Sequence, residues 1–242
     1  MPASARKDTL ESLLRLRKLD YTVVDDERWP DDRRWPIADR QSVPTGLPDL
    51  DARLDGGFPR GHLSDLYGPR SSGRLTILVS ALAGATGRGE AVALIDPLDM
   101  FDPVSAAASH IDFTRLLWVR GEAVSSARVS LSCEYGTLQK ALDRGVKALN
   151  LVLQTGGFGL VVLDLGEVAP QTIKRLPYTT WLRLHRVIEG SETACVLIGS
   201  EPIARSAGGV NVQLGYGTAR VIRARKLESD RDVRVPLSAC AC

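Results

Sequence analysis

Short apolar segments alternate with helical segments from about residue 44 to residue 199 of this chain. A helical pattern follows residues 63–67, another fills residues 135–154, and a third surrounds residues 181–185. Strands that alternate with helices of this length form parallel sheets with right-handed crossovers. The sequence therefore predicts an α/β core with a mostly parallel sheet and helices on both faces. The expected strands are residues 63–67, 90–96, 116–119, 159–165 and 193–199.

The two ends of the chain follow other patterns. Residues 218–226 and 232–237 alternate in the strand period around a polar turn, which predicts an antiparallel hairpin at the sheet edge. Residues 1–43 form an arm and linker in front of a core domain over residues 44–242. The arm combines a short amphipathic helix with two Arg-Trp-Pro units, which either hold the linker against the core or dock a partner protein. The candidate partner-binding residues are Leu10, Leu13, Leu14, Trp29 and Trp35.

Charge and cysteine usage exclude several classes of protein. With 31 Lys and Arg against 29 Asp and Glu, the net charge is +2, so a wholly basic nucleic-acid coat protein is excluded while a local basic face is not. No apolar run approaches the roughly 20 residues of a membrane span, and the N-terminus lacks the apolar core of a secretory signal. We therefore expect a cytoplasmic protein with reduced thiols. The three histidines lack metal-ligand spacing, and Cys240 and Cys242 could oxidise or bind a soft metal but supply only two ligands, so we expect no metal site.

A glycine-rich loop between the first strand and its helix carries most of the chemistry. Gly68 and Gly73 occupy the glycine positions of the phosphate-binding pattern G-x-x-x-x-G-K-[ST]. Arg74 replaces the lysine, and its planar fork does not fit where a compact ammonium sits. Leu75 replaces the hydroxyl that would hold Mg²⁺, and Thr76 lies about 100° further around the helix. We predict no certain cofactor, weak binding of ATP or ADP and no rapid hydrolysis.

Two further assignments depend on this loop. Main-chain N–H groups carry such an anion site, so we assign no role to the side chains of Arg70, Ser71 and Ser72. Asp164 ends an apolar strand about 90 residues later, where it is either the Walker-B acid of a nucleotide fold or a cap and turn residue.

Several motifs in order resemble the RecA core. Thr45-Gly46-Leu47, the run from Gly56 to Gly61 and Leu66-Tyr67-Gly68-Pro69 resemble the segment leading into the RecA phosphate loop. Ile95-Asp96 and Phe101-Asp102-Pro103 resemble the second core strand and its exit. The likeness covers about residues 44–200 and implies a RecA-like fold. Two departures bear on activity: Leu98 stands where RecA has its catalytic glutamate, and the second DNA-binding loop is shortened to about residues 201–209.

Among RecA relatives, the altered loop and the basic tail are most similar to the ImuA family. That resemblance implies a bacterial accessory protein of SOS translesion synthesis, associated with the nucleoid when DNA is damaged. It implies RecA, ImuB and an error-prone replicative polymerase subunit as partners. Because the retained fold would offer a RecA-type subunit surface, we also predict association of the arm and the adjoining core with RecA or with a second copy of the chain. The basic tail either contacts DNA or protects a sheet edge through its charges. Its candidate DNA-binding residues are Arg220, Arg223, Arg225 and Lys226.

Two other functions stay open at this point. The first is a DNA-stimulated ATPase in which Arg74 substitutes for lysine and Asp164 holds a metal through water. The second is a stress-induced inhibitor of cell division, which needs neither nucleotide nor DNA. The sequence favours a weakly hydrolysing or non-hydrolysing accessory protein that acts through protein contacts.

Overall fold

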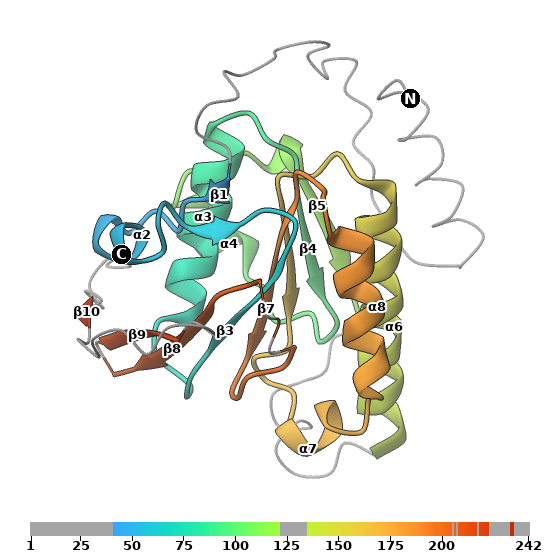
Figure 1. The fold of residues 1–242 in the computed structure, drawn as a ribbon. Coiled ribbons are helices and arrows are strands. Elements are labelled where there is room, and N and C mark those ends of the chain that lie inside the picture. Colours follow the sequence, from blue (N-terminus) through green and yellow to red (C-terminus); the bar gives the residue numbers. More distant parts are fainter. Residues whose placement is uncertain are drawn as a thin grey trace.

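A computed structural model describes residues 41–121, 135–204, 206, 208–216, 218–222 and 233–234. Its centre is an eight-stranded sheet in the order β10-β9-β8-β3-β7-β6-β4-β5 (Figure 1). The strands from β8 to β5 run parallel to one another, and β9 and β10 are antiparallel additions at one edge. The predicted α/β class with a mostly parallel sheet is confirmed. The parallel strands are β3 (Leu63–Tyr67), β4 (Val92–Asp96), β5 (Leu116–Arg120), β6 (Leu160–Asp164), β7 (Ala194–Gly199) and β8 (Asn211–Gly215).

The helices cover both faces of this sheet, as predicted (Figure 1). α3 (Arg74–Gly87) packs Ile77 and Leu82 into one buried cluster with sheet residues such as Leu94. α6 (Tyr135–Thr155) and α8 (Tyr178–Ile188) pack on the opposite face, where Leu149 and Trp181 belong to a second buried cluster. Burial on both faces explains why the central strands are continuous apolar runs.

Shorter elements fill the connections between these helices and strands. α2 (Pro48–Arg53) begins with a proline, which suits the first turn of a helix because the missing N–H has no partner there. The carboxylate of Asp51 in this helix accepts hydrogen bonds from Thr45, so the segment that leads into the core is fixed locally. The remaining short elements are β1 (Ser42–Val43), β2 (Phe58–Pro59), α4 (Pro103–Ala107), the 3₁₀ turn η2 (Phe113–Arg115) and α7 (Pro170–Ile173).

The antiparallel edge contains one more hairpin than the sequence predicted. β9 (Thr218–Ile222) pairs with β10 (Val233–Arg234), which confirms the expected terminal hairpin. β9 also pairs antiparallel with β8, a strand that the sequence analysis did not predict. β8 is only five residues long and alternates buried and exposed positions, so it lacks the apolar run that marked the other parallel strands.

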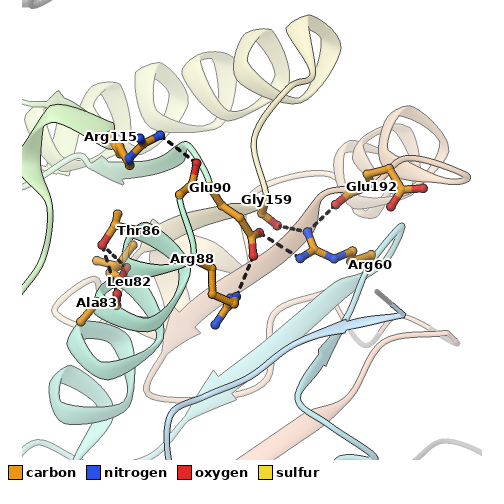
Figure 2. A network of polar contacts seen from close by, with 10 residues as sticks. Arg60, Leu82, Ala83, Thr86, Arg88, Glu90, Arg115, Gly159 and Glu192 are labelled. Atoms are coloured by element: carbon orange, nitrogen blue, oxygen red, sulfur yellow. Dashed lines mark hydrogen bonds and ion pairs between the residues drawn. The ribbon is translucent and has the colours of Figure 1, made fainter. Parts of the chain in front are cut away.

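A polar network ties together the chain at the amino-terminal ends of the parallel strands (Figure 2). Arg60, before β3, donates to the main-chain oxygens of Gly159 (3.1 Å) and Glu192 (2.7 Å), which precede β6 and β7. Its Nη2 also lies 2.9 Å from the carboxylate of Glu90, which precedes β4 and binds Arg88 as well. Ligand sites of open α/β sheets lie at the opposite, carboxyl end of the strands. We therefore assign the Arg60 network to stability.

Several predicted features fall outside the described residues. These are the arm with Leu10, Leu13, Leu14, Trp29 and Trp35, the tail residues Arg223, Arg225 and Lys226, and Cys240 and Cys242. Across the ranges that the structure does describe, we find no helix with the length and apolarity needed to cross a membrane.

Candidate functional site

The glycine-rich loop joins the carboxyl end of β3 to α3, as the phosphate-loop pattern predicts. Gly73 precedes the helix with a φ of +94°, and Ser71 also has a positive φ. A Cβ on Gly68 would lie 2.5 Å from the main-chain oxygen of Leu214, so only glycine lets the loop pack against β8. Strand, loop and helix are thus placed so that main-chain N–H groups at the helix start can meet an anion.

Arg74 does not point freely out of the loop. Its side chain is buried, its Nη1 donates to the main-chain oxygen of Gly166 at 2.9 Å, and its Nη2 lies 3.5 Å from Oε1 of Glu167. Gly166 and Glu167 follow the end of β6. The guanidinium therefore links the phosphate loop to the β6 exit, and its charge is already compensated within the protein.

A second arginine of the loop binds the same acid. Arg70 forms an ion pair with Oε2 of Glu167, so the carboxylate of Glu167 lies between two guanidinium groups. The sequence analysis assigned no role to Arg70 and did not single out Glu167. The signal available in the sequence was an acid three positions after Asp164, at the strand end that the topology turns toward the loop.

The next two helix positions are Leu75 and Thr76. Leu75 exposes 54% of its surface at the start of α3, and Thr76 is half-buried one position later. An exposed leucine supplies no oxygen to a cation, so this helix start lacks the Mg²⁺ contact of a complete phosphate loop.

Asp164 ends β6 beside this cluster. Its Oδ1 accepts a hydrogen bond from the main-chain N–H of Gly166 at 2.8 Å. Burial raises the pKa of Asp164 to about 6, with a smaller contribution from the negative charge of Asp96, while the Gly166 N–H and Arg74 oppose the rise. Asp164 and Arg74, both singled out in the sequence, therefore lie close enough to affect each other.

Leu98 lies in the turn after β4, between two carboxylates that bind neighbouring groups. Leu98 is buried in the apolar cluster beneath α6 and α8. The carboxylate of Asp96 accepts hydrogen bonds from the main-chain N–H groups of Met100 and Phe101. Asp99 forms a two-pronged ion pair with Arg120, which also stacks on Trp118 at 4.4 Å. Both flanking carboxylates thus hold the turn after β4 in shape.

The segment over residues 201–209 connects β7 to β8 across β3. Ala204 is buried, and its N–H donates to the carboxylate of Asp65, itself buried in β3, at 3.2 Å. Gly209 lies so close to the main chain of Leu63 that a Cβ would approach its oxygen to 1.7 Å. This connection packs against the sheet at these two points.

The remaining candidates belong to other elements of the fold. Arg220 is on β9, where it pairs in register with Gln213. The rings of His62 and His185 are 6.0 Å apart, and His110 has a positive φ in the loop before η2. The described part of the chain holds no group of three or more His, Cys, Asp or Glu side chains placed to share a metal ion.

Comparison with known sequences matches the part of the chain that carries the loop. A model of the RecA N-terminal domain matches residues 34–127, which include the loop and Leu98 and end before Asp164. This region is RecA-like. The RecA-like segment is 40% identical over 77 residues to the RecA protein of Prochlorococcus marinus (strain MIT 9303), covering 32% of this chain and 20% of that protein.

Other cyanobacterial relatives give the same picture. The RecA protein of Picosynechococcus sp. (strain ATCC 27264 / PCC 7002 / PR-6) is 37% identical over 86 residues, which is 36% of this chain and 25% of the relative. The RecA protein of Synechococcus sp. (strain CC9605) is 39% identical over 77 residues, or 32% and 21%. The RecA-like match thus spans about a fifth to a quarter of these relatives.

Proposed function

We propose that this protein is a RecA-like accessory factor of DNA-damage tolerance that binds nucleotide weakly and hydrolyses it slowly or not at all. The observation that carries the proposal is the internal neutralisation of the phosphate loop. Arg74, at the position of the loop lysine, is bound to Gly166 and Glu167. Phosphoryl transfer depends on cations that stabilise charge on the transferred group, and a guanidinium engaged inside the protein supplies little of that stabilisation.

Two apolar replacements support the same proposal. Leu75 gives the loop no hydroxyl for Mg²⁺, and Leu98 gives the β4 exit no base to activate water. A RecA-like fold that lacks these groups retains surfaces through which it can meet other proteins. By the ImuA resemblance, we propose RecA, ImuB and an error-prone replicative polymerase subunit as its partners in SOS mutagenesis, with direct DNA contact as a further role of the basic tail.

Turnover of ATP with and without single-stranded DNA tests the nucleotide half of the proposal. We expect no turnover above background under either condition. A rate near one per second that Asp164→Ala abolishes would overturn the proposal and favour the DNA-stimulated ATPase, in which Asp164 holds a metal through water.

Affinity capture from DNA-damaged cells tests the partner half. We expect the tagged protein to recover RecA together with the polymerase subunits, and we expect Leu13→Asp with Leu14→Asp to reduce that recovery. A matched control is Val104→Asp with Leu182→Asp, which places the same two charges on exposed aliphatic residues of α4 and α8. Equal recovery by the arm variant, the control and the wild type would show that the arm is not the docking segment.

A further inference from the structure

Glu167 occupies an unusual position for an acidic residue beside a phosphate loop. It follows β6, while Arg70 and Arg74 belong to the loop after β3, and β7 lies between these two strands in the sheet. Both of its carboxylate oxygens face guanidinium groups of the loop. The carboxylate of Glu167 therefore occupies the two arginines that a bound phosphate group would otherwise contact.

The two ion pairs differ in how strongly solvent screens them. The Arg74 side chain is 9% exposed and that of Glu167 is 20% exposed, whereas the Arg70 side chain is 69% exposed. Screening weakens exposed pairs far more than partly buried ones. Arg74 is therefore the main electrostatic partner of Glu167, and Arg70 closes the pair from the solvent side.

One buried group within the loop is left without a partner. Among the described residues, the Ser72 hydroxyl is almost fully buried and forms no hydrogen bond. It faces Gly68 across the loop, because a Cβ on Gly68 would lie 2.8 Å from the Ser72 Oγ. Buried hydroxyls are normally satisfied, so an unpaired one inside a loop of this geometry indicates that the loop is built to accept a further polar group.

We propose that Glu167 is an internal competitor that holds the phosphate loop closed to anions. Its carboxylate takes the place of a phosphate on Arg74 and Arg70, and a polyanion such as the triphosphate of a nucleotide binds only when Glu167 leaves. The proposal rests on the proposed function, since it gives the reason why a loop with retained glycines and two cations binds nucleotide weakly. The Glu167 carboxylate and a triphosphate compete because both bind the guanidinium groups of Arg70 and Arg74. The triphosphate can displace the carboxylate because it carries several negative charges and the carboxylate carries one, and this exchange needs no metal ion.

Neutralising Glu167 tests this directly. Affinity for inorganic triphosphate and for ATP, without divalent metal, is measured by titration calorimetry on the full chain. If the open state makes up about a tenth of the wild-type protein, Glu167→Gln binds both ligands about tenfold more tightly. Adding Arg74→Gln to Glu167→Gln should remove that gain, because the freed cation is then lost.

Two further variants separate competition from net charge and from misfolding. Glu192→Gln makes the same charge change at the opposite end of the sheet and should leave affinity at the wild-type value. Glu167→Asp keeps the charge but withdraws the carboxylate by about 1.5 Å, so it should raise affinity even if the glutamine variant fails to fold.

Three results would overturn the proposal. They are equal affinity of the wild type and both Glu167 variants, an equal gain in Glu192→Gln, and no binding by any variant. Each can occur while wild-type turnover stays at background and partners are still recovered. Failure of the internal competitor is therefore distinguishable from failure of the proposed function.

Discussion

Asp164→Asn should stabilise the protein at neutral pH and not at acidic pH. Burial raises the pKa of this carboxyl from 3.8 to about 6, so the folded state disfavours the charged form. Each pKa unit corresponds to 1.36 kcal/mol, so the charged carboxylate costs about 3 kcal/mol above pH 7. An asparagine resembles the neutral acid and keeps an oxygen for the Gly166 N–H, but it also brings an amide N–H₂ that needs a partner. We therefore expect a net gain of about 1–2 kcal/mol.

The sign of the pH dependence follows from proton linkage. Between pH 3.8 and about 6 the folded protein holds a proton at Asp164 that the unfolded chain has lost. The contribution of this residue to stability therefore falls as pH rises through that window, and is most favourable below it. The Asp164→Asn variant should therefore be about 1–2 kcal/mol less stable than wild type at pH 4, where only the cost of the amide remains, and about 1–2 kcal/mol more stable by about pH 7.

Urea unfolding of both proteins from pH 4 to pH 8 measures this difference, and other titrating groups cancel when the two proteins are compared at each pH. Asp49→Asn, on an exposed position of α2, is the control and should change stability by less than about 0.5 kcal/mol at every pH. An Asp164→Asn variant less stable than wild type at pH 7.5, or a difference independent of pH, would refute the reasoning.

Three other changes test contacts in different parts of the fold by urea unfolding. Leu98→Ala should cost about 2–4 kcal/mol, since it opens a cavity in a buried cluster; a cost below 1 kcal/mol would contradict the placement of Leu98. Glu90→Gln removes the charge that binds both Arg60 and Arg88, and should cost about 2 kcal/mol, less in high salt. Asp65→Ala leaves the buried N–H of Ala204 unpaired and should lower the free energy of unfolding by about 1–3 kcal/mol. We also expect faster proteolysis within residues 201–209, and unchanged cleavage would argue against anchoring of this connection by Asp65.

Much of the fold was readable from the sequence because the central strands are buried on both faces. Residues 63–67 were predicted as a strand with the bounds of β3, and residues 135–154 differ from α6 by one residue. The β8 strand escaped prediction because its five residues alternate buried and exposed positions and so form no continuous apolar run.

Within the candidate site, the sequence singled out the loop, the two replaced positions and Asp164, because each of these predictions depends on a local pattern. It missed the role of Arg70 because an arginine in a loop carries no signal about its partner. At the opposite end of the sheet, it missed Arg60, whose contacts reach main-chain oxygens at Gly159 and Glu192, far along the chain.

The sequence by itself determined the α/β class, the place of the phosphate loop and the loss of its lysine and hydroxyl. These follow from hydrophobic periodicity and from the chemistry of single residues, which act over a few positions. Only the tertiary structure decided what the loop cations bind. Glu167 lies more than 90 positions from Arg70 and Arg74, and the strand order brings the exits of β3 and β6 to the same end of the sheet. The energy of an ion pair depends on the distance between the two charges in space, and a local sequence pattern does not predict that distance for residues so far apart in the chain.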